Sequence, residues 1–448
     1  MSSPLPPALS GANAGDSCDF FRSFAYKTIK DRIPAILVKV VDIAHRRRHE
    51  MISMHGEAAS DDVKSVVGQL SELRYRMMTD KPILPLTTNR IDADLWRDEF
   101  ANEVKLAGAE ENVRWFKSSW LFVECYMYRK INEILERSSL LHDWDPFTMQ
   151  KEQAFVAALP SMRELGANIL NIIAQHSHDS LVSEIVSDML QLSLWGNKYD
   201  LSISAGEQHV DDPDHSPLAV IHKFKDHIVC NHLDTAVLYL LNLPKTTSDL
   251  CVHFVMDNVG MELFSDLCLA EYLLAAGLAN KIVFHLKLMP WFVSDVTPLD
   301  FNWTLEFLRS ATDQSLSVLA HKWQQHIDEG AFILDAHPFW TTAHPFHDMP
   351  RVAPDLYTSL QQAPFLIIKG DLNYRKLVSD LDWPTTTPFN ESLRDFHPTA
   401  LLALRTLKAD LCVGLSPGQA DTLTASNADW MVKGDYAVIQ FDCATATN

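Results

Sequence analysis

Along the first half of the chain, apolar residues recur every three or four positions. The stretch from Val63 to Met77 shows the pattern clearly, with apolar side chains at positions 63, 66, 67, 70, 73 and 77. This spacing matches the 3.6-residue turn of an α-helix with one buried face. It continues from Phe20 to Leu241, so we expect a mainly helical region over residues 19–245.

From Leu250 onward the pattern changes to short apolar runs, rich in β-branched and aromatic residues, that alternate with helical stretches. This alternation is typical of β-α units and a parallel sheet. The expected helices are Glu262–Ala276, Leu299–Ser310 and Ser315–Ile327. The expected strands are Cys251–Met256, Ile282–Leu288, Ala331–Leu334, Phe365–Lys369, Leu411–Leu415 and Ala437–Phe441.

The length of 448 residues exceeds that of one ordinary compact core and indicates two domains, or one large α/β domain with a helical addition. We therefore predict an α/β fold, with a three-layer α/β/α domain and a mainly parallel sheet over residues 246–448. The helical region precedes it. Residues 1–18, rich in Pro, Ser, Ala and Gly, are expected to form a disordered leader, and Ala205 to Pro217 an exposed loop.

Composition and charge exclude several classes of protein. The formal net charge of −20 would repel DNA and RNA, so we expect no nucleic-acid partner. Apolar runs such as Ala236 to Leu241 are far shorter than the roughly 20 residues of a membrane helix, so no membrane contact is expected. The leader lacks the features of a signal peptide, and the seven cysteines lie far apart. We expect a cytoplasmic protein, with the nucleus as a second location. The sequence leaves a protein partner unknown.

Polar residues follow the expected strands where ligands of open parallel sheets bind, at the carboxyl ends. The first strand runs into Asp257 and Asn258, and the second is followed by Asp295. Carboxylate and amide oxygens without a thiolate suit magnesium, manganese or a similar divalent ion. The alternative is that these side chains are ordinary helix caps or turn residues.

Two further segments could contact an anionic substrate. Lys369-Gly-Asp-Leu-Asn-Tyr-Arg375 combines a glycine turn with Asn373 and Arg375, and Arg405-Thr-Leu-Lys408 places two cations three residues apart. The alternatives are an ordinary β-to-α turn and a pair of solvated charges. If a metal and these cations share a phosphoryl group, the arrangement suits phosphoryl transfer.

At these positions the sequence resembles the metal-dependent damage-control phosphatases, in subfamily III, the acidic residue methyltransferase 1-like branch. The resemblance rests on five blocks that cover most of the chain. They are TDKPILPL (Thr79–Leu86), RWFKSSWLFVECYMYRKI (Arg114–Ile131), FVMDNVGMELFSDLCLAEYLL (Phe254–Leu274) with Ser294-Asp295, IIKGDLNYRKL (Ile367–Leu377), and the Arg405-Thr-x-Lys408 (RTxK) signature.

The resemblance implies a phosphoric monoester hydrolase that acts on small phosphorylated metabolites, including fructose 1-phosphate and fructose 6-phosphate, in metabolite repair. It implies a divalent ion, Mn²⁺, Co²⁺ or Ni²⁺ with Mg²⁺ as a further candidate, held by Asp257, Asn258 and Asp295. The catalytic residues are then Asp257 and Asp371. The substrate-binding residues are Glu124, Asp257, Asn258, Asp371, Leu372, Asn373, Tyr374, Arg375, Arg405 and Lys408.

Three questions stay open at this stage. The nucleophile is either a water on the ion or Asp257 itself, and Glu124 is either a substrate contact or an internal ion-pair partner. The name of the branch also carries an S-adenosylmethionine-dependent carboxyl methyltransferase as an alternative function. No Gly-x-Gly-x-x-Gly loop follows a strand, which favours the phosphatase.

Overall fold

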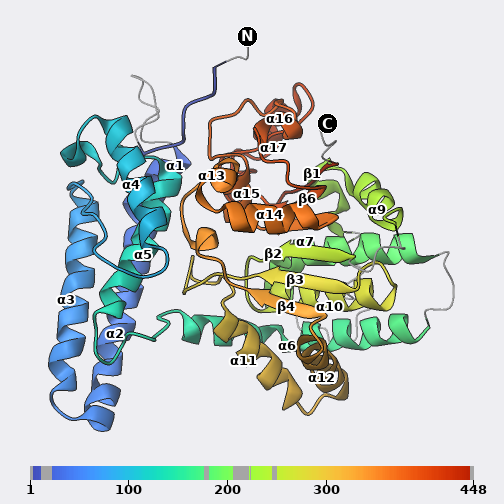
Figure 1. Ribbon diagram of the computed structural model, residues 1–448, viewed down its shortest axis with the longest axis horizontal. Coiled ribbons are helices and arrows are strands. Elements are labelled where there is room, and N and C mark those ends of the chain that lie inside the picture. Colours follow the sequence, from blue (N-terminus) through green and yellow to red (C-terminus); the bar gives the residue numbers. More distant parts are fainter. Residues whose placement is uncertain are drawn as a thin grey trace.

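A seven-stranded sheet forms the centre of the larger part of the molecule in the computed structural model (Figure 1). The structure describes residues 4–11, 23–175, 181–204, 221, 223–244 and 250–443. The strands are β1 (Ile228–Asn231), β2 (Cys251–Val255), β3 (Lys281–His285), β4 (Phe332–Asp335), β5 (Phe365–Lys369), β6 (Leu401–Thr406) and β7 (Ala437–Asp442). The helices are α1 (Phe24–Lys27), α2 (Ile33–His55), α3 (Ala59–Met78), α4 (Ala93–Ala107), α5 (Trp120–Glu136), α6 (Thr148–Ala174), α7 (Val182–Ser204), α9 (Leu233–Leu241), α10 (Met261–Ala275), α11 (Pro298–Arg309), α12 (Gln314–Asp328), α13 (Met349–Val352), α14 (Pro354–Gln362), α15 (Asp371–Leu377), α16 (Phe389–Ser392) and α17 (Gln419–Ser426).

The strand order is β1-β7-β6-β5-β2-β3-β4, and among the described strands β6 and β7 form the one antiparallel pair. At the centre, Val255 of β2 lies beside His285 of β3 and Ile368 of β5. Strands β3, β2, β5 and β6 are therefore neighbours. Because β3, β2, β5 and β6 are parallel, the segments that follow them meet at one edge of the sheet.

Helices cover both faces of the sheet. Consecutive strand residues point to opposite sides, and both sides carry apolar residues that must be buried. Phe254 belongs to a core shared with α6, α7, α10, α11 and α12. Its neighbour Val255 belongs to a second core that contains residues of α13, α14 and α15. The predicted α/β class and three-layer arrangement are confirmed.

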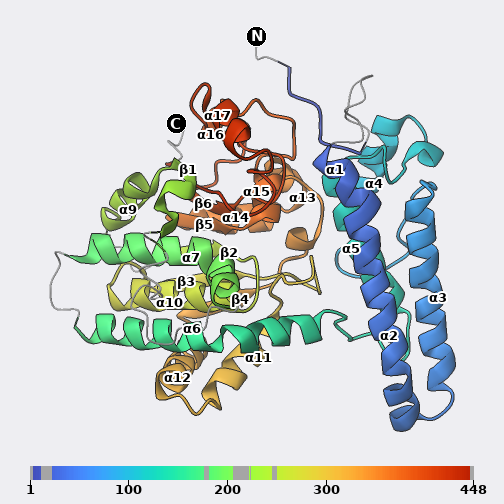
Figure 2. The same cartoon turned by 180° about the vertical axis from the view of Figure 1, so that it is seen from behind.

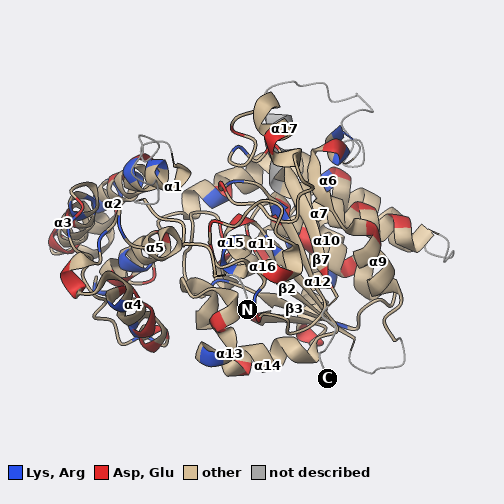
Figure 3. Cartoon of the chain, turned by 90° about the horizontal axis from the view of Figure 1, so that it is seen from above, with Lys and Arg blue, Asp and Glu red and all other residues tan. Residues whose placement is uncertain are grey.

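The N-terminal helices α1 to α5 pack around a core of their own. Figure 2 shows α2 and α3 side by side at the end of the molecule away from α9. Acidic and basic residues are interspersed on these helices (Figure 3). Four residues from the sheet-containing part, Trp291, Ala343, Leu372 and Ala409, complete this core. No described helix combines the length and apolar composition that crossing a membrane requires.

The structure corrects two assignments of secondary structure. The expected strand Leu411–Leu415 is wrong. The strand in this part of the sequence is β6, at residues 401–406, and residues 411–415 are irregular chain that packs in the core beside α15. Strand β1 lies inside the region expected to be mainly helical, and α6, α7 and α9 pack on the sheet. A helix that packs on a sheet has the same periodicity as one in a bundle, so the pattern did not separate them.

The expectation of disorder does not hold for residues 4–11 of the leader. The Leu9 amide donates to the carbonyl of Asp380 at 2.9 Å, and the Trp120 amide donates to the carbonyl of Leu9 at 2.8 Å. These bonds hold the segment between α5 and the chain that follows α15. The expected loop at 205–217 and the expected domain boundary at 245 lie outside the described residues.

Helix α4 joins the sheet-containing part through a buried acid–histidine contact. The Ala343 amide donates to Glu99 at 3.1 Å, and the ring of His344 lies 3.5 Å from the other Glu99 oxygen. Burial raises the pKa of Glu99 to about 7. Burial lowers the pKa of His344, but the charges of Glu99 and Asp348 outweigh it and raise that pKa overall.

Both shifts predict that the folded protein loses stability as the pH rises. A group whose pKa is higher in the folded than in the unfolded protein contributes its stability below the unfolded pKa and loses it as the pH passes the folded pKa. We therefore expect the free energy of unfolding to fall by about 1–3 kcal/mol as the pH rises from about 4.5, the ordinary pKa of a glutamate, through about 7, the pKa of Glu99 in the folded protein. Urea denaturation of Glu99→Gln should show a flatter pH dependence than wild type, whereas Glu111→Gln, at an exposed position, should not. Equal slopes for all three proteins would contradict the assignment.

Candidate active site

The loops that follow β2 and β3 pair with each other at the carboxyl edge of the sheet. The Val259 amide donates to the carbonyl of Ser294, and the Val296 amide donates to the carbonyl of Asp257, both at 2.9 Å. Asn258 and Asp295 form an isolated antiparallel bridge. The structure therefore brings together the three residues expected to bind metal.

The side chain of Asn258 has its orientation set by its neighbours. Its amide nitrogen donates to Asp257 at 2.6 Å and to Glu262 at 3.0 Å. Its carbonyl oxygen accepts a hydrogen bond from the Ser294 hydroxyl at 2.5 Å. The amide therefore lies against carboxylates on its nitrogen side and against a hydroxyl on its oxygen side.

The two aspartates are buried where an ionised carboxylate is costly. Asp257 is 7% exposed and Asp295 is 2% exposed. Burial raises the pKa of Asp257 well above its usual range, the nearby Glu262 and Asp295 carboxylates raise it further, and Lys408 and Lys287 oppose them. Burial also raises the pKa of Asp295 to about 6. Added positive charge would let both acids ionise.

The same residues fit a divalent cation. One oxygen of Asp295, Oδ2, is buried and accepts no hydrogen bond from the described residues; the Lys287 amine lies 3.6 Å away, beyond hydrogen-bonding distance. Among the described residues, no group of three His, Cys, Asp and Glu side chains could hold a metal. The ligand set consequently depends on the amide of Asn258 with the two aspartates, which is an all-oxygen set.

Gly370 lets the next strand approach this cluster. It follows β5 with φ of 87° and ψ of 171°, a conformation that is essentially confined to glycine. A Cβ at this position would overlap the carboxylate of Asp257. The absence of a side chain therefore creates the space in which Asp257 lies.

Asp371 connects the strand β5 turn to the loop after β6. Its carboxylate accepts from Arg405 at 2.8 Å and from the Lys408 amide at 3.0 Å. Burial opposes ionisation, but the charges of Arg405 and Arg375 outweigh it and lower the pKa of Asp371. The ionised Asp371 thus holds the backbone of Lys408, whose side-chain charge acts on Asp257.

The guanidinium groups of Arg375 and Arg405 form hydrogen bonds and ion pairs with other groups of the protein. Arg375 donates to Glu124 at 2.7 Å and to both oxygens of Asp380, and it stacks on Trp120 at 3.6 Å. Arg405 is fully buried over the ring of Tyr374 and also donates to the carbonyls of residues 409 and 411. Glu124 is therefore an internal ion-pair partner here, and substrate contact by these side chains stays a prediction.

Three other expected substrate residues are held in place by neighbouring chain. Asn373 donates to the carbonyls of Met256 and Lys369. Tyr374 donates to Gln440 at 2.7 Å on the far side of the turn, and Leu372 belongs to the core of the N-terminal helices. These contacts give all three residues a part in shaping the turn after β5.

Comparisons with known proteins decide the family. The sequence profile of the damage-control phosphatase ARMT1-like domain matches residues 28–423. The chain is 42% identical to damage-control phosphatase ARMT1 of Rattus norvegicus, over 94% of this chain and 96% of that protein. It is 40% identical to the Homo sapiens protein of the same name, over 98% and 99% of the two chains. The chain belongs to the damage-control phosphatase ARMT1-like family.

Membership in this family confirms the predicted resemblance and makes the chain a phosphatase, a hydrolase whose family implies a divalent metal ion. A crystal structure of a DUF89 family protein from Pyrococcus horikoshii is 15% identical, with a TM-score of 0.37, and covers 79% of this chain and 92% of that one. This likeness is too low to add to the argument.

Three buried charges beside the ARMT1-like site were missed from the sequence. The Lys287 amine, fully buried, donates to Asn373 at 3.0 Å and to the carbonyl of Met256 at 3.3 Å. Glu262 and Lys369 form an ion pair behind Asn258 at 3.2 Å. A signal was available for Lys287 and Lys369, because each is the one charged residue in an apolar expected strand, and such residues are almost never buried unless paired. Glu262 gave no such signal, because α10 also carries Asp266 and Glu271.

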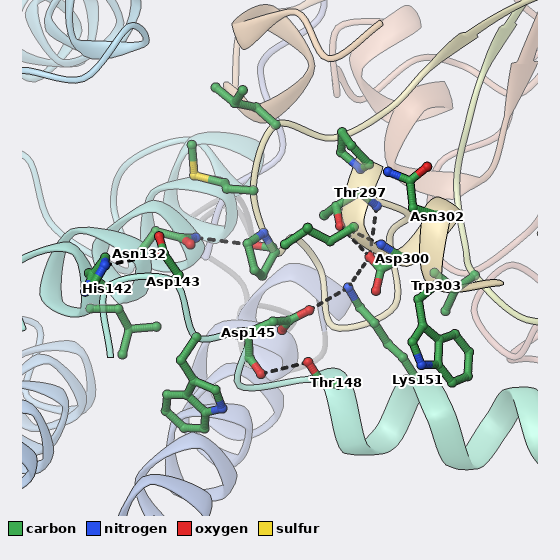
Figure 4. Close-up of a pocket in the computed structure, with 18 of the residues that line it drawn as sticks. Asn132, His142, Asp143, Asp145, Thr148, Lys151, Thr297, Asp300, Asn302 and Trp303 are labelled. Carbon is green, nitrogen blue, oxygen red and sulfur yellow. Dashed lines mark hydrogen bonds and ion pairs between the residues drawn. The ribbon is translucent and has the colours of Figure 1, made fainter. Parts of the chain in front are cut away.

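A large cavity of about 1150 Å³ borders the loop after β3 (Figure 4). It is lined by residues of α2, α5, α6 and α11, of the segments before α4 and between α5 and α6, and of the loops after β2 and β3. None of the expected site residues contributes to it. Its buried Lys151 is neutralised by Asp145 at 2.9 Å and by Asp300 at 2.7 Å. The Asp257 cluster differs in that Asp295 keeps a buried carboxylate oxygen with no hydrogen-bond donor among the residues that the structure describes.

Proposed function

We propose that this damage-control phosphatase hydrolyses sugar phosphates at the edge where Asp257, Asn258 and Asp295 meet. Fructose 1-phosphate and fructose 6-phosphate are the leading substrates. The observation that carries the proposal is the pair of buried aspartates with one amide oxygen between the ends of β2 and β3. Their burial supports a small phosphorylated metabolite, because a phosphate on a protein surface would not reach side chains that are 2–7% exposed.

Asp257, Asn258 and Asp295 would hold the ion, for which Mn²⁺, Co²⁺ and Ni²⁺ are the proposed choices and Mg²⁺ a further one. A bound divalent ion supplies charge for the phosphoryl oxygens and lowers the pKa of water. The chain itself contributes the cation of Lys408, held toward Asp257 through its backbone contact with Asp371. Lys287 keeps Asn373 and the loop after β2 in place.

Asp371 serves in this proposal as a group that positions Lys408 and is ionised at neutral pH because Arg405 lies beside it. A role as a base would require it to leave these partners. The proposal keeps six further residues as predicted substrate contacts: Leu372, Asn373, Tyr374, Arg375, Arg405 and Glu124. Their contacts within the protein also support the turn after β5. The cytoplasm, with the nucleus as second location, is the proposed compartment.

The test is phosphate release from a panel of sugar phosphates by chelator-stripped protein, with and without added Mn²⁺, Co²⁺, Ni²⁺ or Mg²⁺. We expect metal-dependent release that falls at least about 100-fold in Asp257→Ala, because one of the ion's two carboxylates is lost. Circular dichroism checks that the variant stays folded. Undiminished turnover in Asp257→Ala would refute the site. No release with any metal, together with S-adenosylmethionine binding in calorimetry, would favour the methyltransferase instead.

A further inference from the structure

Glu262 is a buried carboxylate beside the proposed metal site that no step above uses. It lies in the first turn of α10, four residues after Asn258, and is 5% exposed. It does not complete a set of three acidic ligands with Asp257 and Asp295 in the described residues. A buried charge is costly unless its contacts repay it, so its partners indicate its role.

Glu262 connects Asn258 to a fully buried lysine. One carboxylate oxygen accepts from the amide nitrogen of Asn258 at 3.0 Å, and the other accepts from Lys369 at 3.2 Å. Lys369 also donates to Asp266 at 2.9 Å and to the carbonyl of Ser193 at 2.7 Å. The Ser193 hydroxyl donates to Asp266 at 2.5 Å. The chain of contacts therefore runs from α7 through β5 and α10 to Asn258.

Close packing holds the backbone of Glu262. Gly196 of α7 faces the start of α10, and a Cβ at Gly196 would lie 2.8 Å from the Cα of Glu262 and 3.3 Å from its amide nitrogen. Such distances leave no room for a side chain. The glycine thus brings α7 against the turn that carries Glu262, so that the carboxylate has little freedom to move away from Asn258.

An asparagine amide can rotate by half a turn and exchange the positions of its oxygen and nitrogen. Only the oxygen can bind a metal ion, because the NH₂ group is a hydrogen-bond donor. In the observed form, the nitrogen faces the carboxylates of Glu262 and Asp257, and the oxygen faces the Ser294 hydroxyl. The Ser294 hydroxyl can either donate or accept, so it does not select a form. The carboxylates do, because a rotated amide would place oxygen against oxygen.

We propose that Glu262 is a positioning residue that keeps the carbonyl oxygen of Asn258 available to the divalent ion, with Lys369 and Asp266 holding Glu262 in place. The inference rests on the proposed function, since it takes Asn258 as a ligand. It adds a residue that does not touch the ion. Partners behind metal ligands commonly change metal affinity about 10–100-fold when they are removed.

The test is the affinity of chelator-stripped, full-length protein for Mn²⁺, measured by calorimetry. We expect Glu262→Ala to bind the ion about 10–100-fold more weakly than wild type. Glu262→Gln should bind more weakly than wild type but better than the alanine variant, because its side-chain oxygen can still accept from Asn258 while its charge is lost. If Glu262→Ala does not fold, the comparison of Glu262→Gln with wild type decides the question.

Glu271→Ala is the matched control. Glu271 lies on the same helix, is 2% exposed, and pairs with Lys322 at 2.5 Å and His326 at 3.1 Å, away from Asn258. It should lose thermal stability and keep wild-type Mn²⁺ affinity. Wild-type affinity in both Glu262 variants, or an equal loss in Glu271→Ala, would overturn the positioning role. If wild type binds no ion, the metal site itself fails, and this inference fails with it; Asp257→Ala separates that case from a failure of Glu262 alone.

Discussion

Gly370→Ala is expected to abolish metal-dependent phosphate release, with a loss of at least about 100-fold. Two effects act together. The φ of 87° and ψ of 171° are strained for any residue with a side chain, and the added methyl group would overlap the carboxylate of Asp257. Asp257 must then move away from Asn258 and Asp295. Phosphate release and Mn²⁺ affinity, measured on folded protein, would both report the change.

Gly56→Ala separates the strain from the overlap. Gly56 has nearly the same backbone conformation, with φ of 83° and ψ of 179°, and a Cβ there would have no atom within 4 Å. It should lose about 1–3 kcal/mol of stability through strain alone and keep full activity per folded molecule. Full activity in Gly370→Ala would mean that Asp257 need not occupy its observed position.

Lys369→Met should cause the largest loss of stability, about 3–5 kcal/mol of unfolding free energy. The amine is fully buried and neutralises Glu262 and Asp266 while it donates to the carbonyl of Ser193. Methionine has a similar shape and no charge, so both carboxylates would stay buried without their cation. The midpoint of urea denaturation measures the loss.

The control for this variant is Lys433→Met, which removes an exposed lysine paired with Asp429 at 2.7 Å. Exposed pairs of this kind contribute about 0–1 kcal/mol, so its midpoint should barely move. Adding Asp266→Asn to Lys369→Met should restore part of the stability, because one buried charge is removed. If Lys369→Met unfolds at the wild-type urea concentration, the lysine does not neutralise the two acids.

Local pattern was enough to predict the class of fold and the edge of the sheet at which Asp257, Asn258 and Asp295 meet. The run Phe365–Lys369 was predicted with the bounds of β5, and α10 and α12 differ from their expected ranges by one residue at each end. Asp257 was predicted as a metal ligand because a polar residue directly after a buried strand stands out, and Asp295 because it lies in the loop after the next expected strand. These signals depend on residues within one turn or strand, where period and burial are linked.

Local pattern gave a wrong secondary structure where packing against distant segments decides whether an apolar run forms a strand. Residues 411–415 have the composition of a strand, but the position between β5 and β7 is taken by β6, whose Arg405 contacts Asp371 and Tyr374. Local pattern also does not show that Arg375, a predicted substrate contact, pairs with Glu124, which lies 251 residues away in sequence. Neither partner can be read from neighbouring residues.

The residues of this protein on their own indicate a parallel sheet with an oxygen-rich edge and a relationship to a phosphatase family. The folded chain alone decides how those oxygens are held. Lys369 meets Glu262 and Ser193 across 107 and 176 residues of sequence, and Gly370 makes room for the carboxylate of Asp257 from another strand. The physical reason is that periodicity records which side of an element is buried, whereas the partner of a buried charge depends on packing between distant segments.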